Sequence, residues 1–234
     1  SGYSHNNRNS SASFVRAQLL NLLVQWELWD EIIDLSSTMY LEPTSMPDEQ
    51  AKGARALGLA YFAKGDTRRG KAQIAEVSRM LRAQKDLRHQ SADEAEEKAK
   101  SQKKNEADIA KAMADAMKAH ASEIKNIENV LAELRVYNSI GANETKEARE
   151  QMSELKHLPK TRLAQLWLTL GDKEQAEKLA LEALKSATNQ VHPLANYVDI
   201  LARAGKEAEA IESFKTLTRI ASSADLNLPI LKRI

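Results

Sequence analysis

Two glycines in the last third of the chain, Gly171 and Gly205, lie 34 residues apart, and an alanine follows each by five positions, at Ala176 and Ala210. Self-similarity at a fixed period of about 20 to 50 residues is typical of repeat architectures, in which each repeat is one supersecondary unit. Such units bury their apolar faces by stacking on their neighbours. The spacing therefore predicts stacked helix–turn–helix units.

The composition favours helices over sheets. Of the 234 residues, 42% are hydrophobic but only 5% are aromatic, and there are only 8 glycines and 5 prolines. Alanine and leucine, which have high helix propensity, are abundant. We therefore predict an all-α protein with enough apolar residues to form a core.

Charge and residue types exclude several classes of function. With 34 basic and 33 acidic residues the net charge is +1, so no global field would attract nucleic acid or an anionic membrane. The absence of cysteine excludes disulfides, thiolate metal sites and thiol catalysis, but it does not identify a compartment. Apolar runs such as residues 19–24 are far shorter than the roughly 20 residues of a membrane span. We expect no nucleic-acid partner and no membrane insertion.

The chain begins with Ser1-Gly2 and shows no signal-peptide pattern. We interpret it as a fragment of a longer protein, with the opening dipeptide as a cloning remnant. Any targeting signal would then lie outside this sequence, and the localisation stays open. Residues 1–13 are rich in serine and asparagine and have almost no apolar anchor, which predicts a disordered tail or tag remnant.

Residues 14–82 are predicted to form the N-terminal units. Apolar residues at helical spacing predict one helix from Phe14 to Trp26 and a second from Trp29 to Met39, with a break near Glu27. Pro43, and Pro47 four residues later, should end this hairpin because proline lacks the amide donor.

A second unit should begin near Asp48. Within it, Gly58 would permit close approach of a neighbouring helix, and Gly65 would supply the left-handed conformation that turns the chain. Asp66 or Thr67 can then cap the next helix by accepting hydrogen bonds from its first amides.

These positions carry a resemblance. When Gly65, Gly171 and Gly205 are taken as the same turn position, the chain resembles a tetratricopeptide repeat array. The family's leucine-glycine-tyrosine signature is matched by Leu57, Gly58 and Tyr61, approximately by Leu163, Ala164 and Trp167, and in a third unit by Tyr197, Val198 and Leu201. The match is degraded in the first hairpin, which lacks the turn glycine, and in a short unit with Ala148, Met152 and Leu155.

The resemblance implies an α–α superhelix of about five helical hairpins, with C-terminal units over residues 126–221. Residues 222–234 are too apolar to be free in water, so we predict a tail that caps the last helix, with the start of a further element as the alternative. The resemblance also implies that a ligand is contacted by the first helix of each unit, which faces the inner groove. The positions concerned are Gln18, Asn21, Gln25, Arg55, Leu59, Phe62, Arg162, Gln165, Asn196, Asp199 and Arg203. The family's clamp for a terminal carboxylate is not reproduced, because Ala17 and Ala56 occupy two of its positions.

Residues 83–125 interrupt the units. From Arg82 to Lys125 there is no proline or glycine, charge of both signs is dense, and the apolar residues are mainly alanines. We predict a break near residues 101–105 and a projecting antiparallel coiled-coil hairpin, with disorder as the competing interpretation. About 20 extra residues at roughly 1.5 Å rise per residue would make it project about 30 Å. Its alanine seam should bury little area, so the tip should be the least stable part.

No catalytic motif is present, and we expect no enzyme activity and no cofactor. One metal arrangement is an alternative: folding at residues 101–105 would bring Asp86 and His89 near His120 and Glu123. We favour solvated flank residues at all four positions and predict no metal site. The three tryptophans, in apolar runs at helical spacing, are predicted to pack in the core, and Met113 and Met117 to lie in the hairpin seam.

The leading functional hypothesis is a non-catalytic scaffold for protein–protein interaction, which binds a peptide segment or a neighbouring domain in its groove. The alternative is a structural or regulatory segment of a larger multidomain enzyme, because the pattern also resembles repeat regions attached to bacterial thioredoxin-like (redoxin) domains. Self-association through the hairpin is a third hypothesis.

Overall fold

The computed structural model describes residues 11–41, 46–187, 190–222 and 228–234, with side chains from Ser13 onward. Every secondary-structure element among these residues is helical, which confirms the all-α prediction. The N-terminal part contains α1 (Ser11–Gln25), α2 (Trp29–Leu35), α3 (Pro47–Ala63) and α4 (Thr67–Ser101). The middle contains α5 (Glu106–Ala119), α6 (Ala121–Gly141), α7 (Thr145–Gln151) and the 3-10 turn η1 (Met152–Leu155). The C-terminal part contains α8 (Lys160–Thr169), α9 (Lys173–Ser186), α10 (Val191–Ala204), α11 (Glu207–Ile220) and α12 (Pro229–Lys232).

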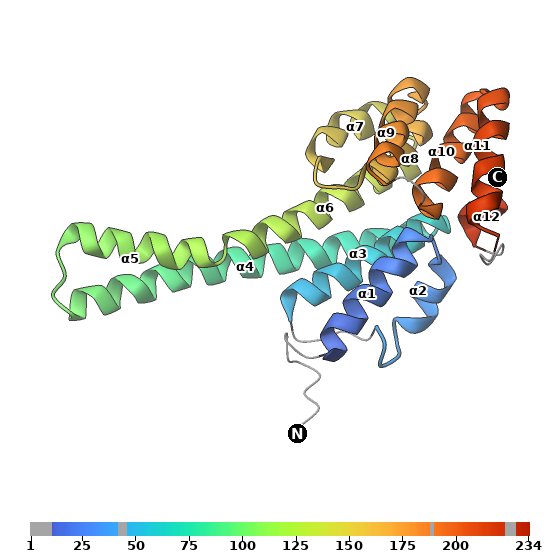
Figure 1. Ribbon diagram of the computed structural model, residues 1–234. Helices are drawn as coiled ribbons and strands as arrows, with labels where there is room; N and C mark the ends of the chain where they lie inside the picture. The colour runs from blue at the N-terminus through green and yellow to red at the C-terminus, as the bar shows by residue number, and fades with distance from the viewer. Residues whose placement is uncertain (1–10, 42–45, 188–189, 223–227) are drawn as a thin grey trace.

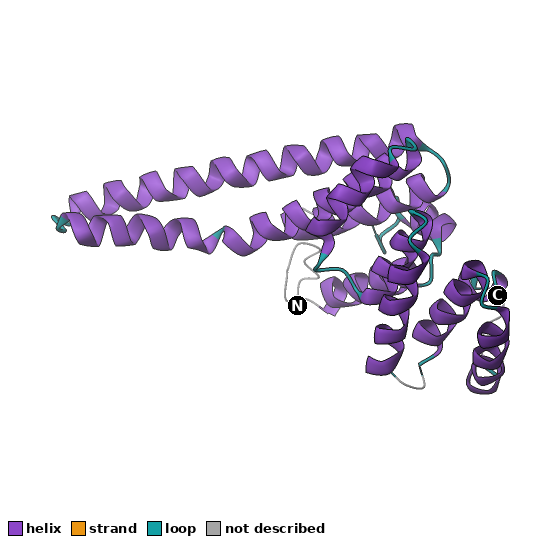
Figure 2. Ribbon diagram, turned by 90° about the horizontal axis from the view of Figure 1, so that it is seen from above, coloured by secondary structure: helices purple, strands orange, loops and turns teal. Residues whose placement is uncertain are grey.

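The helices cluster at one end of the molecule, and a two-armed hairpin projects from the cluster (Figures 1 and 2). The outgoing arm is α4 and the returning arm is α5 followed by the first part of α6 (Figure 1). The strongest helix–helix packing forms two groups, one of α1 to α7 with η1 and one of α8 to α12. Side chains described below join the two groups.

The turns between paired helices share one hydrogen-bond pattern. Gly65, Gly171 and Gly205 have φ of 77°, 80° and 88°, the left-handed conformation predicted for them. The amide after each glycine donates to a carbonyl five residues earlier, as in Asp172 N to Trp167 O at 2.9 Å. This is the Schellman closure of a helix C-terminus. Glu27, Lys103 and Asn143, with φ of 58°, 57° and 61°, close three further turns in the same way. The turn without glycine in the first hairpin thus keeps the same geometry.

The break in the projecting hairpin lies where it was predicted, because α4 ends at Ser101 and α5 begins at Glu106. With 35 residues α4 is 21 residues longer than α9, which corresponds to about 30 Å of extra helix at about 1.5 Å per residue. In the outer half of α4 the buried residues are Ala92 and Ala99, while α5 has no buried residue. The returning arm is broken a second time at His120, between α5 and α6.

Helix α6 lies at the centre of the first group and packs against α3, α4, α7 and η1. Its approach to α3 depends on Gly58, because a Cβ at that position would lie 2.6 Å from Cδ2 of Leu134. The prediction that Gly58 permits close approach is therefore confirmed, and the neighbour is α6. Ala148, Met152 and Leu155 of the degraded unit are buried in the cluster that α6 forms with α7, η1 and α8.

Several expected boundaries change. α1 begins at Ser11, so the end of the predicted tail is helical, while residues 1–10 lie outside the described residues. α2 ends at Leu35, and Met39 is exposed beyond it. Pro47 is the first residue of α3, where a missing amide donor costs no helical hydrogen bond, and Pro43 lies outside the described residues.

Candidate functional site

The residues predicted to line the groove divide into three sets. Gln18, Asn21 and Gln25 are exposed on α1. Arg55 and Arg162 belong to a buried ion network around Glu133, and Gln165, Asp199 and Arg203 belong to a second network near α12. The remaining members are packing residues. Leu59 is 0% exposed, Asn196 is 2% exposed, and the ring of Phe62 lies against Gly70.

Leu59 and Asn196 are therefore interior positions and not groove contacts, and Phe62 is half-buried against the partner helix α4. The physical reason is that the first helix of a unit also packs against its own partner helix and its neighbours, and helical spacing alone does not separate these faces. Asn196 donates to the Thr161 carbonyl at 3.4 Å, which links α10 to α8.

The first network is centred on Glu133, whose side chain is 0% exposed on α6. Arg55 of α3 donates twice to it, from Nε to Oε2 at 2.5 Å and from Nη2 to Oε1 at 3.0 Å. Arg162 of α8 places Nε 3.7 Å from Oε1 of the same carboxylate. A fully buried carboxylate is tolerated only when it is paired and hydrogen-bonded, so these two arginines are structural partners of Glu133.

Arg162 is also enclosed by aromatic rings. Its guanidinium carbon lies 5.5 Å from the centre of the Trp29 ring and 5.8 Å from that of Tyr137, within the range of cation–π attraction. Burial acts to lower the pKa of Arg162, but the charges of Tyr137, Glu133 and Glu27 outweigh it and raise the pKa. Burial in the same place raises the pKa of Tyr137 to about 12. This cluster joins α2, α6 and α8.

The second network is centred on Asp199 of α10, which is 1% exposed. Gln165 of α8 donates from Nε2 to Oδ2 at 2.9 Å. Two arginines lie near the same oxygen, Arg203 with Nη1 at 3.7 Å and Arg233 with Nη2 at 3.7 Å. Arg233 also donates from Nη1 to Oε2 of Glu27 at 2.5 Å, so it bridges two carboxylates.

Apolar contacts accompany this bridge. Ile230 of α12 is 1% exposed and packs in a cluster with Leu194 and Val198 of α10 and Leu217 of α11. Trp26, at the turn between α1 and α2, packs against the same cluster. Its ring meets the His192 ring edge-on, with 5.3 Å between ring centres. Residues 228–234 of the predicted capping tail therefore cover α10 and the end of α11, while Ile211 and Phe214 of α11 stay exposed; residues 223–227 lie outside the described residues.

The tryptophans pack as predicted. Trp26 and Trp29 lie partly buried against apolar clusters of the chain, and Trp167 packs between α6, η1 and α9. Met113 and Met117 are half-buried on α5.

The exposed face of α1 carries apolar residues that the groove prediction did not include. Phe14, Val15 and Leu22 are 65%, 59% and 50% exposed. Because Phe14, Gln18 and Leu22 are spaced by four residues, they lie on one face of the helix. We call Phe14, Val15, Gln18, Asn21 and Leu22 the α1 surface. The signal that could have identified it is that the apolar residues of α1 are spread around the helix and so exceed what one buried face requires.

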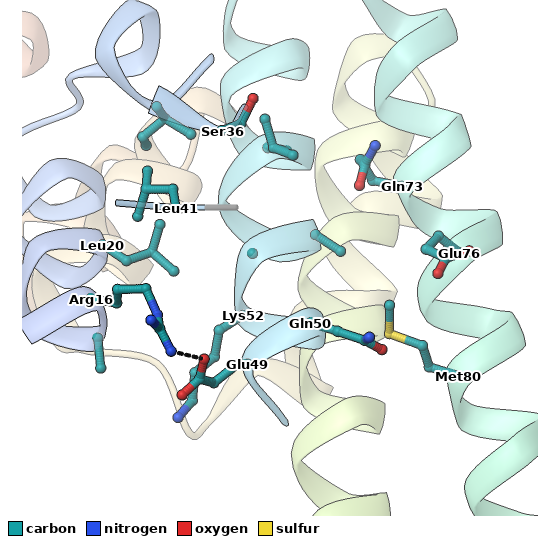
Figure 3. A pocket seen from close by; sticks show the side chains of 15 residues that line it. Arg16, Leu20, Ser36, Leu41, Glu49, Gln50, Lys52, Gln73, Glu76 and Met80 are labelled. Atoms are coloured by element: carbon teal, nitrogen blue, oxygen red, sulfur yellow. Dashed lines mark hydrogen bonds and ion pairs between the residues drawn. The ribbon is translucent and has the colours of Figure 1, made fainter. Parts of the chain in front are cut away.

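A pocket of about 200 Å³ lies between α1, α2, α3 and α4 (Figure 3). Apolar side chains, among them Leu20, Ile32 and Met80, supply most of its wall, and the ion pair of Arg16 with Glu49 lies at one side (Figure 3). Its volume is below the roughly 300 to 1,000 Å³ typical of small-molecule sites. The pocket is suited to one apolar side chain.

The alternative metal arrangement in the hairpin is not formed. Nε2 of His120 lies 2.9 Å from the Ser91 hydroxyl, and His89 is exposed. The described part of the chain contains no group of three or more histidine, aspartate or glutamate side chains placed to hold a metal ion. None of its helices combines the length and the hydrophobicity that crossing a membrane requires.

Comparison of the chain with models of protein families, with curated proteins and with solved structures gives no match.

Proposed function

We propose that this chain is a non-catalytic module for protein–protein interaction that binds a protein or peptide segment. The observation that supports the proposal is the α1 surface, where three large apolar side chains of one helix are at least half exposed. Exposed apolar side chains that share a face are typical of interaction sites. Gln18 and Asn21 place amide donors and acceptors among them, which would orient a bound backbone.

The proposal retains Gln18 and Asn21 from the predicted groove, whereas substitutions at Arg55, Phe62 and Arg162 would not test it. Alanine at the latter three would disturb the Glu133 network or the packing on Gly70, so lost binding could not be separated from lost stability.

The test selects peptides from a display library against the full chain and measures their affinity for variants. We expect the pair Phe14→Ser and Leu22→Ser to weaken selected peptides at least tenfold, because both side chains would lose apolar contact with the ligand. The matched control is Ile211→Ser with Phe214→Ser, which removes two exposed apolar side chains from α11. A library that yields no peptide sensitive to the α1 pair would contradict the proposal, and so would equal losses in both double variants.

A further inference from the structure

The segment from Leu228 to Ile234 is bound to the rest of the chain as a short peptide ligand would be. Its own helix, α12, has only four residues, so its position depends on contacts with other elements. Ile230 supplies a buried apolar anchor against α10 and α11. Arg233, three residues later, supplies a cation that reaches two carboxylates.

The surface beneath this segment is complementary to a cation. The carboxylate of Asp199 is almost fully buried, and Glu27 is 17% exposed. The two carboxylates come from α10 and from the turn after α1, so together they form an acidic pair that only the folded chain assembles. Burial acts to lower the pKa of Arg233, but the hydrogen bond that Arg233 donates to Glu27 and the charges of Glu27 and Asp199 raise it.

The backbone at Glu27 supports a role beyond turning the chain. Of the six turns with positive φ in the described residues, three use glycine, one uses Asn143 and one, at the tip of the projecting hairpin, uses Lys103. Glu27 adopts a φ of 58° although a glutamate there is strained. The carboxylate that meets Arg233 thus stands at a turn that glycine or asparagine would form with less strain.

We propose that Glu27, Asp199 and the apolar surface of Leu194 and Val198 form a peptide-binding site, and that residues 228–234 are its built-in occupant. The site recognises an apolar side chain followed three residues later by an arginine. A partner segment with this pair would compete with residues 228–234 for the site. The inference rests on the proposed interaction function for the existence of a partner, but it does not use the α1 surface.

The geometry favours arginine over lysine. Nη1 of Arg233 meets Glu27 while Nη2 faces Asp199, so two separate nitrogens of one planar guanidinium serve the two carboxylates. A lysine ammonium is a single point of charge and does not reproduce this fork.

The experiment uses the full chain and a fluorescent synthetic peptide of residues 228–234, with binding followed by fluorescence anisotropy. The variant Ile230→Ser weakens the internal occupant, so we expect the peptide to bind it at least tenfold more tightly than the wild-type chain. Arg233→Ala in the chain is the second variant, because Arg233 is partly exposed and its loss leaves the apolar cluster intact. Circular dichroism melting checks that each variant is folded.

Three controls define specificity. Arg233→Ala within the peptide, and Glu27→Gln or Asp199→Asn added to the chain, should each reduce binding at least tenfold. Equal affinity for wild type and both variants would overturn the inference, as would binding that survives these controls. A wild-type dimer that Arg233→Ala dissociates would also overturn it, because residues 228–234 would then be exchanged between copies. The two proposals can fail separately. If the 228–234 peptide does not bind but the α1 variants still bind their selected peptides more weakly than the wild-type chain does, this inference is wrong and the proposed function stands.

Discussion

At the scale of single residues, backbone conformation and burial decide which positions resist substitution. Gly171 adopts φ of 80°, and a Cβ built on it would have no atom within 4 Å. Any cost of a side chain there is therefore conformational. Gly53 also has open space around its Cβ position, but it lies within α3.

The two glycines give a matched pair of predictions. Gly171→Ala should lower the free energy of unfolding by about 1 kcal/mol, because alanine is strained at positive φ. Gly53→Ala should raise it by up to about 1 kcal/mol, because alanine loses less backbone entropy in a helix. Urea denaturation of both variants checks the signs. A loss of stability in both would show that contacts of the added methyl group, and not φ, decide the effect.

Glu133 gives the second residue-scale prediction. Glu133→Gln leaves the guanidinium groups of Arg55 and Arg162 without their buried counter-charge, so the free energy of unfolding should fall by about 3 kcal/mol. The control is Glu212→Gln, which makes the same chemical change in an exposed pair with Lys215 and should cost less than about 0.5 kcal/mol. Equal denaturation midpoints for the two variants would remove the structural role assigned to Glu133.

At the scale of elements, the base and the tip of the hairpin differ in how they are supported. α6 buries nine residues, including Ile127, Leu134 and Val136, whereas α5 buries none. The outer half of α4 buries only alanines, which remove little apolar area from water.

This difference predicts a gradient of local stability. Amide hydrogen exchange, followed by mass spectrometry, should be fastest in residues 92–119 and slowest in α6 beyond Ile127. The first half of α4, which packs on α3, is the internal reference because it belongs to the same helix. Uniform protection along α4 would show that the hairpin opens only with global unfolding.

At the scale of the whole molecule, the turn between α1 and α2 contacts the C-terminal helices. Trp26 packs on His192, and Glu27 pairs with Arg233, 206 residues away in sequence. Burial lowers the pKa of His192, and the charge of Arg162 acts in the same direction. A hydrogen bond with the Gln25 backbone and the charge of Glu27 act to raise the pKa, but the net shift is downward.

The lowered pKa predicts a pH dependence with a definite sign. Since the folded-state pKa of His192 lies below the ordinary value of 6.5, the unfolded chain binds more protons as the pH falls through this range. The stabilisation from neutral His192 is present above that value and is lost on acidification. Melting temperatures of His192→Gln should therefore fall less than those of the wild-type chain between about pH 7.5 and pH 5.

His157 also has a pKa lowered by burial, but it is present in both proteins, so the difference between their profiles isolates His192. Parallel profiles for wild type and His192→Gln would contradict the assignment.

The sequence by itself determined the local features of this fold. Glycine at 65, 171 and 205 selects left-handed turns because glycine alone has no Cβ penalty there, and Asp66 and Asp172 cap the helices that follow, each accepting a backbone amide three residues on. The break at residues 101–105 followed from spacing and charge. All of these depend on residues within a few turns of one another.

Only the tertiary structure decided which groups pair with the residues predicted to line the groove. Arg55 pairs with Glu133, 78 residues away, and Asp199 and Glu27 face Arg233 from distant helices. Helical periodicity identifies the face on which a side chain lies, but the group across from it depends on how helices stack in space. For that reason the sequence placed Gln18 and Asn21 on an exposed surface, while it did not reveal that part of its groove is covered by the chain's own residues 228–234.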